Sequence, residues 1–219
     1  MLVRAMAIGL VLAAISGTAF AADYGAAAAD PGASPNWQGA YIGGSVGYSW
    51  GTANLSATGG GAGSLGIDPT GFLVGAQAGY DFHVSDRIVA GLEGNLDWTN
   101  QQVSVSTGGP SLNYNTNFEG SVRGRLGYDI GNAMPYVEAG VAFANATISA
   151  PGVTTNSPTY TGWTAGAGLE YMIADNISAN IEYRYSDYGT QTFLAGGLGS
   201  GLNSHFTDSS VRLGVDYHF

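Results

Sequence analysis

The stretch AYIGGSVGYSW, residues 40–50, alternates between two kinds of side chain. The first set is mostly apolar and comprises Ala40, Ile42, Gly44, Val46, Tyr48 and Trp50, and the second is small or polar and comprises Tyr41, Gly43, Ser45, Gly47 and Ser49. A period of two is typical of a β-strand whose two faces meet different surroundings. A strand of a water-soluble β-sandwich also alternates in this way, so the rest of the chain must decide which face meets water.

The composition argues against an ordinary soluble domain. The chain has 219 residues, enough for one sizeable domain, and only 10% of them are charged. A soluble domain averages about 25% charged residues. The mean hydropathy of +0.08 is too low for a bundle of membrane helices. No segment after the N-terminus has ~18 consecutive apolar residues, so the sequence predicts no membrane-spanning helix.

Charge and cysteine content exclude further classes of protein. Six arginines and no lysine stand against 16 acidic residues, which gives a net charge of -10. Nucleic acid would be repelled, and no basic stripe exists to attract it. There is no cysteine, so the chain forms neither disulfides nor thiolate metal sites.

The N-terminal segment has the pattern of a secretory signal peptide. Arg4 gives a positive start, residues 5–15 form an uncharged apolar run, and Ala19-Phe20-Ala21 is a small-x-small cleavage motif. The run is shorter than the ~20 residues that a spanning helix needs. We predict a signal peptide over residues 1–21, cleaved after Ala21 or Ala22, a flexible periplasmic leader over 22–36, and the folded domain over 37–219.

Eight segments repeat the opening pattern. They are Gly39–Trp50, Gly71–Phe82, Ile88–Trp98, Phe118–Ile130, Tyr136–Phe143, Gly162–Ile173, Ile177–Tyr185 and Phe206–Phe219. Most are near the ~9–11 residues with which a tilted strand crosses a bilayer. In each, one face is apolar, and the other is rich in glycine with few charges.

That difference between the faces favours a closed barrel over a sandwich. In a sandwich the charged face would meet water, but here this face is a poor solubiliser because it is mostly glycine and small polar residues. Eight strands leave an interior just wide enough to fill with side chains, and glycine permits close approach of the backbone. The large apolar face then meets lipid, and the sheet must close because open edges in hydrocarbon leave backbone groups unpaired.

The connections alternate between long and short. The long ones are residues 51–70, 99–117, 144–161 and 186–205, and the short ones are residues 83–87, 131–135 and 174–176. Outer-membrane barrels have short periplasmic turns and longer external loops. The sequence therefore predicts an all-β fold, an eight-stranded antiparallel up-and-down transmembrane β-barrel with four long external loops, three short periplasmic turns and both termini in the periplasm.

Aromatic residues gather at the ends of the predicted strands. Those expected at the outer interface are Tyr48, Trp50, Trp98, Phe118, Phe143 and Trp163, and those at the inner interface are Tyr80, Phe82, Tyr128, Tyr171, Tyr217 and Phe219. The β-propensity of aromatic residues is an alternative explanation. Two girdles are favoured because outward positions in mid-strand are mostly Ala, Val, Leu and Ile.

Three motifs carry a resemblance to a known family. They are Trp37-Gln38-Gly39-Ala40-Tyr41-Ile42-Gly43-Gly44, Arg125-Leu126-Gly127-Tyr128 and the ending Val211–Phe219. In these the chain resembles the small eight-stranded outer-membrane barrels of alphaproteobacteria, the porin-like surface-antigen family, with an OmpA-like transmembrane barrel. The resemblance covers Trp37 to the end.

The resemblance implies a location in the outer membrane of a Gram-negative envelope, among lipid and lipopolysaccharide. It also implies that the final aromatic residue, Phe219, serves as the signal read by the barrel-assembly machinery. Family members are described as surface antigens, as porins and sometimes as haem binders, but no fixed motif for these roles maps onto this chain. We expect no peptidoglycan-binding domain after the barrel.

Charged residues on the inward face form the most specific constellation. They are Glu93, Glu119, Arg123, Arg125, Glu138, Glu170, Glu182, Arg184 and Arg212. Charge in a confined interior is costly unless it is paired. One interpretation is a Glu–Arg network that plugs the lumen. The other is an ion-selective constriction or gate, in which the excess of acids favours cations.

The three histidines do not predict a metal site. His83 lies in a short turn, His205 near an outer strand end and His218 at the C-terminus, so they are spread over both membrane faces. A haem site remains a hypothesis, with His205 in the fourth loop and Phe193, Phe206 or Tyr188 beside it. We otherwise expect no metal and no cofactor.

The sequence predicts no catalytic residues. A lipid deacylase needs a serine and a histidine within hydrogen-bond reach of each other, and His205-Phe206-Thr207-Asp208 departs from that enzyme's His-x-Ser motif. A barrel protease needs pairs of Asp and His at the outer rim, and only one histidine lies at that rim. We predict a structural, surface-exposed outer-membrane barrel with a lumen largely plugged by the Glu/Arg network. The alternatives are a small cation-favouring porin and loop-mediated binding of haem or a host surface, with the partner of the loops unknown.

Overall fold

The computed structural model describes residues 36–57, 64–105, 112–149, 159–194 and 201–219. The predicted signal peptide and all of the predicted leader except Asn36 lie outside these residues. Within the described part, no helix has the length and apolar character that a membrane crossing requires.

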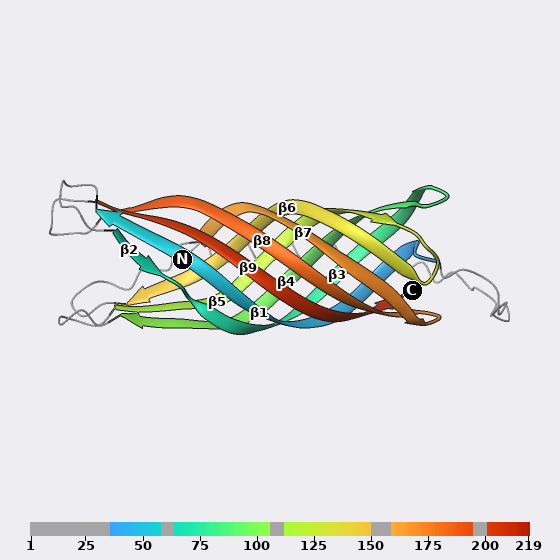
Figure 1. Cartoon of the computed structure of the whole chain (residues 1–219), viewed down its shortest axis with the longest axis horizontal. Coiled ribbons are helices and arrows are strands. Elements are labelled where there is room, and N and C mark those ends of the chain that lie inside the picture. The colour runs from blue at the N-terminus through green and yellow to red at the C-terminus, as the bar shows by residue number, and fades with distance from the viewer. Residues whose placement is uncertain (1–35, 58–63, 106–111, 150–158, 195–200) are drawn as a thin grey trace, which may run out of the picture. The chain divides into compact units, whose positions relative to one another are not determined.

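Strands make up almost all of the described chain (Figure 1). They are β1 Gly39–Ala57, β2 Ser64–Ile67, β3 Thr70–Ser85, β4 Ile88–Val105, β5 Leu112–Tyr128, β6 Ala133–Ser149, β7 Thr159–Ala174, β8 Ile177–Leu194 and β9 Gly201–His218. Consecutive strands pair antiparallel in the order β1-β3-β4-β5-β6-β7-β8-β9, and β9 pairs back with β1. The short β2 adds only to the outer part of β1. The predicted eight-stranded antiparallel barrel is confirmed.

Strand β1 shows which face of residues 40–50 lies inside the barrel and which lies outside. Along β1 the side chains of Tyr41, Ser45 and Ser49 are buried, whereas Ile42 is 52% exposed and Val46 57% exposed. The apolar set therefore covers the outside of the barrel, and the small and polar set lines its interior. The other strands follow the same rule, because successive side chains of a strand point to opposite faces of the sheet.

The aromatic residues predicted for the two girdles all lie on the outside of the barrel, where each is at least 40% exposed. Several are in ring contact, among them Trp98 with Phe118 and Trp163 with Tyr185. The placement at this face agrees with the expectation of two girdles, and their contact with the membrane interface stays a prediction.

Inward glycines make room for large inward side chains on the neighbouring strand. Gly79 is the register partner of Tyr41, and a Cβ at Gly79 would overlap the Tyr41 ring. Gly168 is in the same position relative to Tyr136. The interior is thus filled by side chains that lie flat across a glycine of the next strand.

The predicted outer strand ends were wrong. Several strands continue five to nine residues into segments predicted as loops, for example β4 to Val105 and β8 to Leu194, and His205 lies in β9 rather than in a loop. The reason is physical. At the loop end the alternation changes phase, because outward positions such as Asn145 are polar while inward ones such as Ala144 and Phe206 are apolar. An apolar outward face therefore ends while the hydrogen-bonded ladder continues.

The two ends of the barrel differ. The short connections β3–β4, β5–β6 and β7–β8 lie at the same end as the start of β1 and the end of β9 (Figure 1). We call this the turn end and the opposite end the loop end.

Candidate functional site: the charged lumen

All nine charged residues predicted for the lumen are buried inside the barrel. They are Glu93, Glu119, Arg123, Arg125, Glu138, Glu170, Glu182, Arg184 and Arg212. They come from β4, β5, β6, β7, β8 and β9, at alternate positions along each strand. Burial of so many charges requires partners, and these divide the lumen into layers.

Arg123 is the centre of the middle layer. Its guanidinium forms an ion pair with Glu93 on β4 and a second, of 2.6 Å, with Glu138 on β6. It also donates hydrogen bonds to Asn95 Oδ1, at 2.5 Å, and to Ser121 Oγ. Arg123 is fully buried, so this single cation connects three strands across the interior.

Two further arginines extend the layer toward the loop end. Arg184 pairs with Glu182 at 2.7 Å and with Glu138 at 3.5 Å. Arg212 pairs with Asp97 at 2.7 Å. Glu138 therefore receives both Arg123 and Arg184, which connects strands β5, β6 and β8 through one carboxylate.

Arg125 forms the layer at the turn end. Its guanidinium pairs with Glu170 and, at 3.5 Å, with Asp81. It lies 4.0 Å from the centre of the Tyr136 ring, a cation–π arrangement. Tyr41 accepts a hydrogen bond of 3.3 Å from Arg125 and donates one of 2.7 Å to Glu93, which connects this layer to the middle one.

Ser178, His218 and Glu170 lie together beside this layer but do not form a catalytic triad. Ser178 donates to Glu170 at 2.5 Å, and His218 Nε2 lies 3.0 Å from Ser178 Oγ and 3.1 Å from Glu170 Oε1. In a triad the acid and the nucleophile contact opposite ring nitrogens. Here both contact the same nitrogen, so the group is a buried hydrogen-bonded anchor for the C-terminal strand.

Glu119 differs from the expectation for the network. It is buried, yet it forms no ion pair with any described arginine, and its Oε1 atom has no hydrogen-bond partner in the described part of the chain. Its register partner on β4 is Asp97, whose carboxylate is taken by Arg212. Glu119 therefore lies near the network without an arginine of its own.

Sequence reasoning left two acids and two tyrosines out of the network. Asp81 and Asp97 share the inward side of β3 and β4, and their alternation with Gln77 and Glu93 placed them on that side. Their role follows only from contacts across the lumen. The only sequence signal for Tyr41 and Tyr136 was their position on the inward face among glycines. A tyrosine at such a position extends across the lumen.

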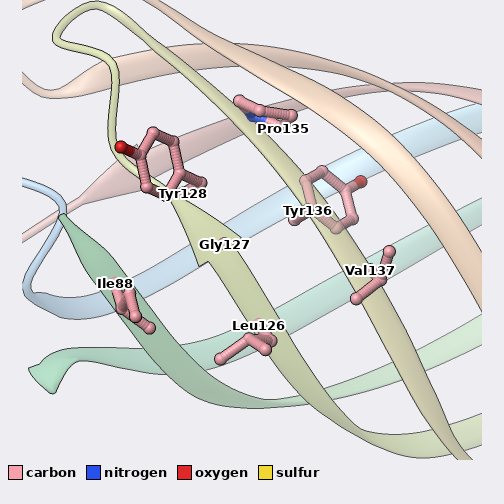
Figure 2. A pocket seen from close by; sticks show the side chains of 7 residues that line it. All are labelled: Ile88, Leu126, Gly127, Tyr128, Pro135, Tyr136 and Val137. Carbon is pink, nitrogen blue, oxygen red and sulfur yellow. The ribbon is translucent and has the colours of Figure 1, made fainter.

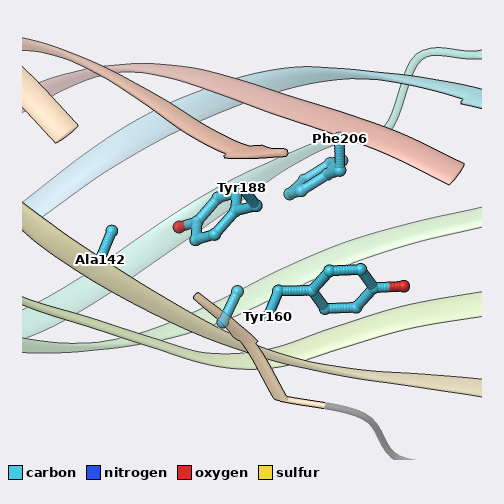
Figure 3. Close-up of a cluster of buried hydrophobic side chains, with 5 residues drawn as sticks. Ala142, Tyr160, Tyr188 and Phe206 are labelled. Atoms are coloured by element: carbon cyan, nitrogen blue, oxygen red, sulfur yellow. The ribbon is translucent and has the colours of Figure 1, made fainter. Parts of the chain in front are cut away.

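Apolar clusters lie at both ends of the charged layers. At the turn end, Trp37 packs with Val89, Met134 and Met172, and its indole N–H donates to the Gly131 carbonyl at 3.0 Å. At the loop end, the cluster shown in Figure 3 comprises Ala142, Ala144, Tyr160, Tyr188 and Phe206. Tyr188 and Phe206 stack with ring centres 5.4 Å apart. Trp37 and Phe206 are almost fully buried.

The geometry does not support the predicted haem environment. His205 is on β9, 42% exposed in its side chain, and lies 3.8 Å from Asp187. The next residue, Phe206, and the predicted neighbour Tyr188 point into the lumen and pack on each other. The two rings therefore face away from His205, and the side chain of Phe193 lies outside the described residues.

Three carboxylates converge closely enough to hold a cation. Oxygen atoms of Glu93, Glu138 and Glu182 lie within 4.8 Å of one another. Each of these carboxylates already pairs with Arg123 or Arg184. These arginines supply the positive charge that the three carboxylates need, so the described lumen fits internal ion pairs better than a metal.

A shallow apolar groove lies on the outside of the barrel near the turn end. Figure 2 shows its lining by Ile88, Leu126, Gly127, Tyr128, Pro135, Tyr136 and Val137. The side chain of Tyr136 is buried in the lumen, and the exposed lining is apolar apart from the Tyr128 hydroxyl, so the groove suits a hydrocarbon chain.

Comparison with known proteins agrees with this architecture. The family model of the outer membrane protein beta-barrel domain matches residues 10–219. The chain belongs to this family. The 25 kDa outer-membrane immunogenic protein of Brucella abortus biovar 1 (strain 9-941) is 36% identical over 185 residues, which cover 84% of this chain and 80% of that protein. The 22 kDa outer membrane protein of Rhizobium leguminosarum bv. viciae is 35% identical and covers 84% of this chain and 79% of its own.

Solved structures show the same fold at low sequence identity. The outer membrane protein OprG from Pseudomonas aeruginosa matches with a TM-score of 0.54 at 14% identity, over 83% of this chain and 97% of that one. Neisserial surface protein A matches with a TM-score of 0.51 at 15% identity, over 82% and 97% of the two chains. This member of the family is therefore an outer-membrane β-barrel of the Gram-negative envelope.

Proposed function

We propose that the protein is a structural, surface-exposed barrel whose lumen is filled by the Glu/Arg network and closed at both ends. The observation that carries the proposal is the layering of the interior. Arg125, Arg123 and Arg184 each bridge carboxylates from other strands. Apolar clusters lie beyond these layers at the turn end and at the loop end.

The energetics of buried ion pairs are consistent with a network that fills the lumen and also fixes the register of the strands. A buried ion pair contributes little net stability compared with well-packed apolar groups, but loss of one partner costs about 3–5 kcal/mol. A shifted register would separate Arg123 from both of its acids at once. The network is thus better suited to specifying one closed barrel than to binding a soluble ligand.

Single-channel recording in a planar lipid bilayer tests the proposal. The material is refolded protein whose gel mobility depends on heating, the usual sign of a folded barrel. We expect no conductance steps from the folded fraction across independent preparations. Reproducible steps that disappear with the heat-denatured fraction would contradict a plugged lumen.

A small cation-favouring porin is the second candidate, and one observation favours it. Nine carboxylates are buried in the described barrel, namely Asp81, Glu93, Asp97, Glu119, Glu138, Glu170, Glu182, Asp208 and Asp216, against the four arginines Arg123, Arg125, Arg184 and Arg212. Such an excess of acids attracts cations. If the recordings show steps, a reversal potential in a KCl gradient that favours K⁺ supports this candidate.

The loop end is proposed to face the outside of the cell. Outer-membrane barrels place their short turns in the periplasm, and the Brucella relative is named an immunogenic protein. On this basis we propose a surface antigen without enzymatic activity. Unchanged lipid A in the mass spectrum of cells that overproduce the protein would support the absence of deacylase activity.

Two partners expected from the sequence remain proposals. We propose that the apolar exterior contacts outer-membrane lipid and lipopolysaccharide, and that Phe219 is read by the barrel-assembly machinery. Phe219 is 77% exposed, and its N–H donates to the Ala40 carbonyl at 3.0 Å. The ring is therefore accessible. Removal of Phe219 should slow assembly in cells without preventing refolding in detergent.

A further inference from the structure

The outside of the folded domain carries a single arginine. The chain has six arginines and no lysine. Arg4 lies in the predicted signal peptide, and four others are buried in the lumen. The remaining one, Arg87, is exposed in the turn between β3 and β4. The one permanent cation on the outer surface of the barrel therefore lies at the turn end.

The side chain of Arg87 reaches the apolar groove of Figure 2. Ile88, the next residue, is the register partner of Tyr128, and both line the groove. Arg87 Nη1 donates a hydrogen bond of 3.4 Å to the Tyr128 hydroxyl. This is its only hydrogen bond to the described chain, so the other N–H donors of the guanidinium are available to a ligand.

The groove continues from this polar corner along β5 and β6. Leu126 and Val137 line it further from the turns, and they are register partners on the two strands. Both are more than half exposed. A site with a guanidinium at one end and exposed hydrocarbon at the other matches an amphiphile better than a water-soluble ligand.

Two carboxylates near Arg87 decide which headgroup fits. Asp86 and Asp129 both interact electrostatically with Arg87. His83 lies 3.5 Å from Asp129, whereas Asp86 has no hydrogen bond or ion pair within the described chain. A purely anionic headgroup would be attracted by Arg87 and repelled by two acids. A headgroup that carries both a phosphate and an ammonium group can satisfy charges of both signs.

We propose that the groove and this corner bind one phospholipid whose headgroup carries a phosphate and a primary amine. An acyl chain would lie between Leu126 and Val137, the phosphate would accept hydrogen bonds from Arg87, and the ammonium group would face Asp86. Arginine suits the phosphate because its donors form a planar fork. The proposal rests on the proposed contact of the apolar exterior with membrane lipid, and it places the lipid in the periplasmic leaflet.

A second copy of the chain matches this corner less well. In a two-fold dimer through this face, the same surface patch meets itself. Two copies of Arg87 would then meet two copies each of Asp86 and Asp129, so acids would outnumber arginines in the contact. The zwitterionic lipid brings the missing ammonium group.

Native mass spectrometry of the folded protein, purified from membranes in detergent, tests the site. The protein is mixed with equal amounts of phosphatidylethanolamine, phosphatidylcholine and phosphatidylglycerol, and the lipid that stays bound to the barrel is identified. We expect one molecule of phosphatidylethanolamine to be retained, with a preference of about 5-fold over each competitor.

A matched pair of variants tests the selection of the amine. Asp86→Asn removes the acid that the ammonium group would face, so it should abolish the preference for phosphatidylethanolamine. Asp175→Asn is the control, because Asp175 is an exposed acid in the turn between β7 and β8 and does not line the groove. It should keep the preference.

The phosphate and the acyl chain have tests of their own. Arg87→Ala should lower retention of phospholipid by about 5-fold, and Arg87→Lys should restore part of it. Val137→Trp should lower retention by filling the groove. Val141→Trp is its control, since Val141 lies on the same outward face of β6 outside the groove and is 47% exposed. Gel mobility that depends on heating confirms that each variant is folded.

The remaining outcomes would overturn the proposal. Retention by the wild type no higher than by Arg87→Ala would remove the site and leave the structural role of the barrel unaffected. Preferential retention of phosphatidylglycerol would show that the acids do not select the headgroup. Equal losses in Val137→Trp and Val141→Trp would place the acyl chain elsewhere, and a dimer that only Val137→Trp disrupts would assign the groove to a second copy. Folded protein that does not insert into lipid vesicles would contradict the proposed lipid contact itself.

Discussion

At the scale of single residues, the interior depends on glycine as much as on charge. Tyr41 and Tyr136 reach across the lumen because their register partners, Gly79 and Gly168, have no side chain. Tyr41 is then positioned between Arg125 and Glu93. Gly79, which has no side chain, therefore decides whether Tyr41 can connect the two charged layers.

A valine at Gly79 tests this dependence. Its side chain would overlap the Tyr41 ring, and overpacking of this kind typically costs about 1–3 kcal/mol. We expect Gly79→Val to lower the free energy of unfolding by that amount, measured by urea titration in lipid vesicles. Gly44→Ala is the matched control, because Gly44 faces outward and a Cβ there would lie 3.6 Å from its nearest neighbour, Gly75 O. A control that loses as much stability would sink the argument.

At the scale of strands, β8 contains a β-bulge, where its register with β9 shifts between Asp187 and Thr190. This bulge depends on one backbone conformation. Gly189 has φ of +66°, and its N–H donates to Asp187 Oδ1 at 2.8 Å. Glycine adopts this left-handed conformation without the steric penalty that other residues meet, and asparagine tolerates it better than most. The position marks where β8 leaves β7 and continues beside β9 alone.

Replacement of Gly189 should reveal that role. We expect Gly189→Ala to lower the unfolding free energy by roughly 1–2 kcal/mol and Gly189→Asn to lower it by less. The measurement is urea unfolding in the same vesicles, with amide exchange of residues 190–194 as a local probe. Equal losses for alanine and asparagine would mean that the positive φ is not the cause.

At the scale of the whole molecule, closure of the lumen depends on charges that no single strand supplies. Arg125 lies on β5, and its acids Glu170 and Asp81 lie on β7 and β3. Arg125→Ala would leave both carboxylates without this cation. Loss of one partner from a buried pair costs about 3–5 kcal/mol, so we expect a less stable barrel and, in the molecules that fold, a rise in conductance.

Arg87→Ala is the control for that prediction. Arg87 lies at the β3–β4 turn, where it is exposed and donates a hydrogen bond to the Tyr128 hydroxyl at 3.4 Å. Arg87→Ala removes one positive charge, as Arg125→Ala does, but from a position outside the lumen. We expect no change in unfolding or in bilayer recordings. If Arg125→Ala behaved like Arg87→Ala in both measurements, the network would have no structural role.

Much of this architecture could be predicted from alternation alone. Period two placed Arg123, Glu93 and Glu138 on the inward face, because a side chain's face is fixed by parity along the strand. Their pairing could not be predicted, since it depends on the relative stagger of non-adjacent strands, which sets how residues meet across a barrel. Arg212 pairs with Asp97 across the lumen, while Glu119, with the correct parity, forms no ion pair with a described arginine.

The ends of the strands escaped prediction for a related reason. An apolar outward face reports contact with lipid, and at the loop end outward positions such as Asn145 are polar while inward ones such as Ala144 and Phe206 are apolar. The hydrogen-bonded ladder has no such limit, so β4 continues to Val105 and β1 to Ala57. The sequence therefore located the membrane band well and the full height of the strands poorly.

The pairing of β1 with β9 has a consequence for the order of events in the cell. The β1–β9 ladder runs from the pair Tyr41 and His218 to the pair Ala57 and Leu202, so the first strand cannot complete its pairing until the last strand is present. A chain that is made and exported N-terminus first carries β1 with an unsatisfied edge through the whole of its synthesis and transit. Closure of the barrel must therefore come after export, as a final step. A chain that is cut short before β9 would keep an open edge on β1, which could pair with other chains.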